Sequence, residues 1–246
     1  MLKAVIFDCD GVIVDSEPLH LKTFQRVLAD EGITLTQEAY NQTYLAMDDK
    51  GCFEAVLTAH NRQTDQAKIK RLIHQKMALY RASQQELHIY AGVHKLVKTL
   101  VGKVHLAIAS GAFRGEIKFA LDQAGIRSAF PVIVSAQDVK QGKPNPEAFL
   151  TALAKLNGLY YDSHAQRGGG LAGYVALLPQ GGVPPGECVV IEDSVHGVMA
   201  ARSAGMKSVA VTNSYPKETL QSFADYVVDS LDTLTIHDLE NLCKTN

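Results

Sequence analysis

Short apolar runs of strand length recur along the chain, and amphipathic segments of helical spacing separate them. The runs occupy residues 3–7, 104–109, 132–135, 187–191, 208–211 and 226–228. Continuous runs of β-branched residues are typical of strands buried on both faces of a parallel sheet. Their alternation with helices at 93–100, 115–124, 146–156 and 195–204 predicts an α/β fold with a mostly parallel sheet, covered by helices on both faces.

One long block departs from this alternation. Between residues 16 and 88 the apolar side chains recur at helical spacing, and no strand-like run interrupts them. Pro18 suits the first turn of the opening helix, whose apolar stripe runs to Gly32. We therefore expect an all-helical domain at 16–88, inserted into an α/β core made of residues 1–15 and 89–246.

The segment 158–182 is the second irregular part of the chain. It is rich in glycine and lengthens the connection between the helix at 146–156 and the strand at 187, although long connections are uncommon in compact domains. That helix leaves the carboxyl edge of the sheet, where α/β proteins bind their ligands, so its far end lies near the opposite edge. We expect this insertion in the core to lie away from the active site.

A glycine pattern within that insertion matches a known nucleotide-binding fingerprint. Residues 168–173 fit GxGxxG, but they follow no predicted strand and precede no helix of useful length. We therefore assign them no nucleotide-binding role.

Composition narrows the classes of function. The 246 residues carry 24 lysines and arginines against 26 aspartates and glutamates, spread along the chain, which argues against nucleic acid and membrane surfaces as partners. The apolar runs are too short to span a membrane, and the N-terminus lacks the build of a signal peptide. Four cysteines without a CxxC pair indicate neither zinc nor disulfides. We expect a cytoplasmic monomer or weak homodimer.

Polar side chains follow the ends of four predicted strands. In chain order they are Asp8 and Asp10, Ser110, Lys143 in the loop shortly after its strand, and Glu192 and Asp193. The carboxyl ends of parallel strands share one edge of the sheet. Four distant segments therefore bring carboxylates, a hydroxyl and an ammonium group to one place.

This set of groups suits a hard cation and a phosphate. Asp8 and Asp10 by themselves fit either a metal site or an acid–base pair, since two adjacent carboxylates repel each other. Oxygen ligands without histidine or cysteine favour Mg²⁺, which takes one or two protein carboxylates together with substrate phosphate. With a cation bound, one carboxylate can attack phosphorus while the lysine and the hydroxyl hold the phosphoryl oxygens.

The same segments resemble the four motifs of the haloacid dehalogenase superfamily, in its Mg²⁺ phosphatase branch. The matching stretches are Asp8-Cys-Asp10-Gly11-Val-Ile-Val-Asp15, Ala109-Ser110-Gly111, Gly142-Lys143-Pro-Asn-Pro146, and Ile191-Glu192-Asp193-Ser194 with Gly197. The block at 16–88 is similar to the inserted cap of that superfamily. The resemblance implies a Rossmann-like core with an inserted all-helical cap. It also implies that the protein hydrolyses a small phosphorylated metabolite, such as a sugar phosphate.

The resemblance also implies roles for single residues. Asp8 is the nucleophile of an aspartyl-phosphate mechanism and a metal ligand. Asp10 is the acid/base and binds the metal through its main-chain carbonyl. Asp193 is a metal ligand, and Glu192 belongs to the metal site directly or through water. Three residues are implied to bind the transferring phosphoryl group: Ser110, Gly111 and Lys143.

Two alternatives remain open. In the related β-phosphoglucomutases a cap arginine grips the distal phosphate of the sugar, but the corresponding residues 45–50 contain none, and an aspartate does not replace a guanidinium. His20 and Lys76 do stand at cap positions seen in that group, which makes them candidate substrate-binding residues. We favour the phosphatase and keep the mutase as the alternative. A non-catalytic phosphate-binding regulatory module is weaker, because every catalytic-type position is filled.

Overall fold

In the computed structural model, which describes residues 1–45, 47–165 and 182–244, the chain forms two compact units. One unit comprises residues 1–14 and 89–246, and the other comprises residues 15–88. The chain passes from one unit to the other twice. At these two crossings the short strands β2 (Val14–Asp15) and β3 (His88–Ile89) pair with each other.

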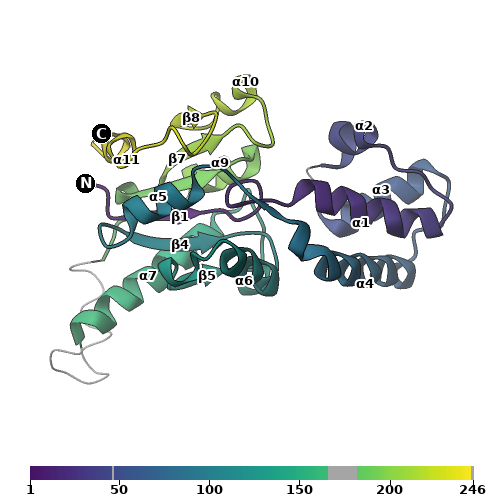
Figure 1. The fold of residues 1–246 in the computed structure, drawn as a ribbon, viewed down its shortest axis with the longest axis horizontal. Coiled ribbons are helices and arrows are strands. Elements are labelled where there is room, and N and C mark those ends of the chain that lie inside the picture. The colour runs from purple at the N-terminus through teal and green to yellow at the C-terminus, as the bar shows by residue number, and fades with distance from the viewer. Residues whose placement is uncertain (46, 166–181, 245–246) are drawn as a thin grey trace. The chain divides into compact units, whose positions relative to one another are not determined.

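The first unit is built on a six-stranded parallel sheet (Figure 1). In the order of the sheet, the strands are β5 (Val132–Val134), β4 (His105–Ala109), β1 (Ala4–Phe7), β6 (Cys188–Glu192), β7 (Lys207–Val211) and β8 (Tyr226–Val228). Each neighbouring pair runs parallel. The predicted α/β core with an inserted helical block is confirmed.

Helices cover this sheet. They are α5 (Val93–Leu100), α6 (Arg114–Gln123), α7 (Glu147–Ala165), α9 (Val195–Ser203), α10 (Lys217–Leu220) and α11 (Ile236–Leu242), with 3₁₀ turns at Arg127–Ala129, Ala136–Asp138 and Pro185–Glu187. On one face, Ile6 and Val190 pack with Phe149 of α7 and Ala200 of α9. Val5, which points to the other face, is also fully buried. Burial on both faces explains why the strands are continuously apolar.

Helix α7 is longer than the sequence pattern predicted. It runs to Ala165 instead of ending near residue 156. The helix continues through Gly158, since one glycine in a helix costs only about 1 kcal/mol relative to alanine. The side chain of Asn157 bonds both main-chain groups of Val183, at 2.7 and 3.3 Å, so the chain returns beside the start of the insertion. The rest of the insertion, with the GxGxxG stretch, lies outside the described residues.

The second unit is helical, as expected. It contains α1 (Glu17–Asp30), α2 (Gln37–Ala39), α3 (Asp49–Ala59) and α4 (Gln66–Ser83), with a π turn at Tyr40–Tyr44 and a 3₁₀ turn at Gln84–Glu86. Asp48 and Asp65 cap α3 and α4, since their side chains accept hydrogen bonds from main-chain N–H groups three residues on. Phe24, Phe53 and Leu72 belong to its apolar core. Among the described residues, no helix is long and apolar enough to cross a membrane.

Candidate active site

The strand register brings the predicted carboxylates to one edge of the sheet. Phe7 at the end of β1 pairs with Ile108 of β4 on one side and with Ile191 of β6 on the other. Asp8 and Glu192 are therefore the next residues on adjacent strands, and the N–H of Asp8 donates to the carbonyl of Ile191 at 2.9 Å. Strand order reverses around β1, and open α/β sheets bind their ligands at such a switch point.

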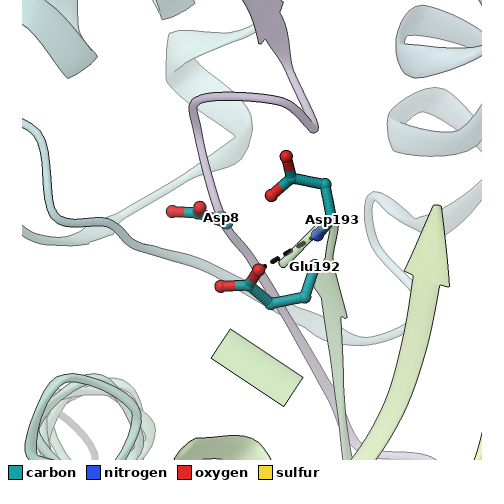
Figure 2. Close-up of side chains that lie close together, drawn as sticks. All are labelled: Asp8, Glu192 and Asp193. Atoms are coloured by element: carbon teal, nitrogen blue, oxygen red, sulfur yellow. Dashed lines mark hydrogen bonds between the residues drawn. The ribbon is translucent and has the colours of Figure 1, made fainter. Parts of the chain in front are cut away.

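Asp8, Glu192 and Asp193 form a buried cluster of carboxylates. Each offers an oxygen within 4.8 Å of the other two. Glu192 is fully buried, while Asp8 is 8% and Asp193 is 6% exposed. Figure 2 shows Asp8 on the chain that leaves β1 and the other two side chains at the end of β6. The structure thus brings these three sequence-predicted metal residues together.

Lys143 joins this cluster from the loop between β5 and α7. Its Nζ lies 3.0 Å from Asp8 Oδ1 and 2.6 Å from Glu192 Oε1. Burial acts to lower the pKa of Lys143, but the two carboxylates outweigh it and raise the pKa, so the lysine stays charged. The loop itself is fixed by Glu147, whose carboxylate accepts hydrogen bonds from two main-chain N–H groups just before Lys143, those of Lys140 and Gln141.

One lysine does not balance three carboxylates. Burial raises the pKa of Asp8 from 3.8 to about 7; Lys143 opposes this shift, and Glu192 and Asp10 reinforce it. Burial, with repulsion from Glu192 and Asp8, also raises the pKa of Asp193 well above its ordinary value. Among the described residues, Asp8 Oδ1 accepts no well-aligned hydrogen bond, although the Lys143 ammonium is near it. A divalent cation would balance this charge, so the residues fit a Mg²⁺ site.

Glu192 has further contacts besides Lys143. Its Oε2 accepts hydrogen bonds from the N–H groups of Asp193 and Ser194, both at 3.0 Å, and from the Ser194 hydroxyl at 2.9 Å. Gly197 in the first turn of α9 leaves room for it, because a Cβ there would lie 1.9 Å from Glu192 Cδ. Glu192 therefore links Lys143 to the start of α9, and these bonds compete with direct metal ligation.

The other predicted core residues surround the cluster. Asp10 forms an isolated bridge with Val14 in the turn after β1, and its carboxylate is outside the three-membered cluster. Ser110 follows β4 directly, is 2% exposed, and accepts a hydrogen bond from the N–H of Ala112 at 3.1 Å. A Cβ on Gly111 would meet none of the described atoms within 4 Å, so open space adjoins its main chain.

His20 and Lys76 come together within the helical unit. Lys76 is 2% exposed; its Nζ lies 2.8 Å from His20 Nδ1, pairs with Asp49, and sits 4.4 Å from the centre of the Phe24 ring. Burial, reinforced by the Lys76 charge, lowers the pKa of His20 to about 3. The imidazole is therefore neutral, and its Nδ1 can accept a hydrogen bond from the lysine.

Two residues that contact the site were not predicted. The Ser214 hydroxyl donates to Asp193 Oδ2, and Asn213 Nδ2 donates to the carbonyl of Gly11 at 2.7 Å. Both follow β7, whose carboxyl end lies at the same edge of the sheet as those of β1 and β6. The available signal was the run of polar residues that follows β7, Thr212-Asn213-Ser214.

With this geometry in place, comparison with known proteins identifies the family. The model of the haloacid dehalogenase-like hydrolases matches residues 2–205, and the chain belongs to this family. The resemblance stated from the four motifs is confirmed.

Two relatives of the chain are named for different activities, one a phosphatase and the other a mutase. The chain is 27% identical over 209 residues to a phosphorylated carbohydrates phosphatase of Thermotoga maritima, covering 85% of this chain and 84% of the relative. It is also 27% identical over 241 residues to the β-phosphoglucomutase of Bacillus subtilis, covering 96% and 92%. The crystal structure of CbbY from Rhodobacter sphaeroides in complex with phosphate shares the fold, with a TM-score of 0.77 at 22% identity over 98% of this chain and all of that one.

Proposed function

We propose that the protein is a Mg²⁺-dependent phosphatase that hydrolyses a small phosphorylated metabolite through an aspartyl-phosphate formed on Asp8. The observation that carries the proposal is the environment of Asp8. It is buried beside two carboxylates and lies 3.0 Å from a charged lysine, at the switch point of a parallel sheet. The similarity to a phosphatase of phosphorylated carbohydrates supports the substrate class.

In this proposal each group has a defined task. The Asp8 carboxylate attacks phosphorus, and the bond to the leaving oxygen breaks as Asp10 gives that oxygen its proton. Asp10 then takes a proton from the water that attacks the acyl phosphate, which releases phosphate and restores Asp8. Three groups stabilise the phosphoryl oxygens: Lys143, the Ser110 hydroxyl and the main-chain N–H of Gly111.

The cation would be held by a defined set of ligands. These are carboxylate oxygens of Asp8 and Asp193, the main-chain carbonyl of Asp10, and Glu192 directly or through water. When bound, Mg²⁺ lowers the repulsion between the anionic nucleophile and the anionic substrate.

The helical unit favours the phosphatase over the mutase. Asp49 lies in the stretch where the mutases carry an arginine, and here it forms an ion pair with Lys76. A second phosphate would meet a carboxylate there instead of a guanidinium fork. We propose His20 and Lys76 as residues that bind the non-reacting part of the substrate, and we keep β-phosphoglucomutase as the second candidate because of the Bacillus subtilis relative.

Phosphate release from p-nitrophenyl phosphate tests the proposal. We expect turnover with Mg²⁺ and none with EDTA, followed by selectivity within a panel of phosphorylated sugars and polyols. Conversion of β-glucose 1-phosphate to glucose 6-phosphate, with a trace of the bisphosphate, would instead establish the mutase. Phosphate binding without either reaction would indicate a regulatory module.

Since all four cysteines are free, we propose a cytoplasmic setting. We also propose that the protein is a monomer or a weak homodimer.

A further inference from the structure

The loop after β7 contacts both segments that carry the candidate catalytic carboxylates. Ser214 reaches the residue after β6, and Asn213 reaches the turn after β1. Both contacts lie within the first unit, and their partners are separated from them by 21 and 202 residues in sequence. Neither residue has a role in the four-motif resemblance.

Ser214 restricts the carboxylate of Asp193. Its hydroxyl donates to Oδ2, and the same oxygen lies against the main chain of Gly11, where an added Cβ would come within 1.8 Å of it. Gly11 adopts a φ of +71°, a conformation that favours glycine. With Oδ2 held between these two loops, Oδ1 is the oxygen left to face a cation.

Asn213 restricts the turn that carries Asp10. That turn is closed by its own main-chain hydrogen bonds, from the N–H of Gly11 to the carbonyl of Val14 at 2.9 Å and from the N–H of Ile13 to the carbonyl of Cys9 at 2.8 Å. The bond from Asn213 to the Gly11 carbonyl ties the closed turn to the loop after β7. The bond therefore anchors the residue that follows Asp10, and with it the main chain from which the Asp10 side chain extends.

We propose that Asn213 and Ser214 are positioning residues of the active site. Ser214 orients Asp193 toward the cation, and Asn213 orients the turn that presents Asp10 to the leaving oxygen. This inference rests on the proposed phosphatase function. A positioning role differs from a purely structural one because it predicts two separable effects. Ser214 would affect cation affinity, and Asn213 would affect proton transfer.

Cation affinity tests Ser214 without any turnover. Binding of Mn²⁺ to the metal-free protein is measured by the loss of the free-ion electron paramagnetic resonance signal. We expect Ser214→Ala to weaken binding about 10- to 100-fold, the usual cost of removing a hydrogen-bond partner of a metal ligand. Ser214→Thr keeps the hydroxyl and should restore affinity, whereas the exposed Ser222→Ala should leave it unchanged.

Two results would overturn the role of Ser214. One is wild-type Mn²⁺ affinity in Ser214→Ala, and the other is equal weakening in Ser214→Ala and Ser214→Thr. If Ser214→Ala does not fold, Ser214→Cys, which has similar size and only a weak donor, takes its place with the same expectations. These measurements remain decisive even if the protein proves to have no phosphatase activity, which would refute the proposed function alone.

Leaving-group dependence tests Asn213. p-Nitrophenolate departs without a proton, whereas a sugar or polyol alkoxide needs one. At saturating Mg²⁺, Asn213→Ala should therefore lower kcat/KM, which covers only the steps up to departure of the leaving group, at least about tenfold more for an alkyl phosphate than for p-nitrophenyl phosphate, since general acid catalysis contributes about 10²- to 10⁴-fold. An equal loss with both substrates, or no loss with either, would overturn the role of Asn213.

Discussion

Asp8 shows why the charge balance of this site points to function. It is buried with Glu192 and Asp193, and in the part of the chain that the structure describes a single lysine pairs with two of the three carboxylates. Taking an ion out of water costs several kcal/mol unless it is fully compensated. Stability alone would favour apolar residues here, so the cluster is best explained by a cation and an anionic substrate that bind to it.

Asp8→Asn tests the nucleophile. The amide keeps the shape of the side chain but cannot attack phosphorus, so we expect p-nitrophenyl phosphate turnover to fall at least about a thousandfold. The fold should be retained, because the change removes a negative charge from a crowded anionic cluster. Circular dichroism checks the fold, and the exposed Asp229→Asn serves as the matched control. Wild-type turnover in Asp8→Asn would rule out Asp8 as the nucleophile.

Glu192 and Asp193 are neighbours with different expected contributions. An amide at 192 offers one acceptor oxygen, so either Lys143 or the start of α9 loses a partner, and Glu192→Gln should destabilise the protein by about 1–3 kcal/mol. Compared with Glu192→Gln, Asp193→Asn should lower the stability of the protein less and weaken Mg²⁺ binding more. Urea unfolding and calorimetric titration separate the two effects. The opposite ranking would make Glu192 the principal metal ligand.

Helix α9 is connected directly to the site through its first turn. Its N-cap Ser194 bonds Glu192 through its own side chain and also accepts the N–H of Gly197 at 3.0 Å. The helix begins against a buried carboxylate, which its positive end stabilises. The close approach is possible only because residue 197 lacks a side chain.

Gly197→Ala and Gly115→Ala form a matched pair of helical glycine substitutions. A Cβ at 197 would lie 1.9 Å from Glu192, whereas at 115, in the first turn of α6, it would meet none of the described atoms within 4 Å. Alanine is favoured over glycine in a helix by about 1 kcal/mol. We expect Gly115→Ala to raise the melting temperature with turnover unchanged, and Gly197→Ala to lower both. Equal behaviour of the two variants would contradict the tight packing at Glu192.

Deletion of residues 158–182 tests the placement of the insertion. Asn157 and Val183 are already hydrogen bonded to each other, so joining them requires little movement of the described chain. Because α7 starts at the carboxyl edge of the sheet and runs away from it, we expect the shortened protein to keep near-normal turnover of a small phosphoester. A folded deletion variant without turnover would show that the insertion contributes to the active site.

For the molecule as a whole, local sequence patterns predicted the parallel sheet and the residues that lie at the ends of its strands. The apolar runs predicted the strands, and parallel strands share a carboxyl edge. These two facts predicted that Asp8, Glu192 and Lys143 lie close together. The pairing of Lys76 with Asp49 could not be predicted, since it depends on how α1, α3 and α4 pack. Asn213 also follows a parallel strand, so the same rule could have placed it at this edge, but its bond to the Gly11 carbonyl depends on the shape of two loops. The end of α7 was placed near residue 156 instead of at Ala165, because the helix continues into the segment taken as an insertion.

The stability of the whole protein should depend on pH and Mg²⁺ together. Burial raises the pKa of Asp8 to about 7, so between its ordinary 3.8 and that value the folded protein holds a proton that the unfolded chain has released. The free energy of unfolding therefore falls as pH rises through this window. The raised pKa of Asp193 acts in the same direction. Mg²⁺ binds the ionised carboxylates, so its stabilising effect should grow over the same range.

Melting temperatures measured with Mg²⁺ and with EDTA, from about pH 5 to about pH 8, give this effect as a difference. The difference should increase with pH up to about pH 7, where Asp8 titrates. Groups away from the site cancel in this difference. An example is Asp138, whose pKa is lowered by hydrogen bonds from Ser135 and Lys155 despite its burial and which does not contact the carboxylate cluster. Asp8→Asn should flatten the curve. A difference that stays constant or shrinks with rising pH would show that these carboxylates do not bind the cation.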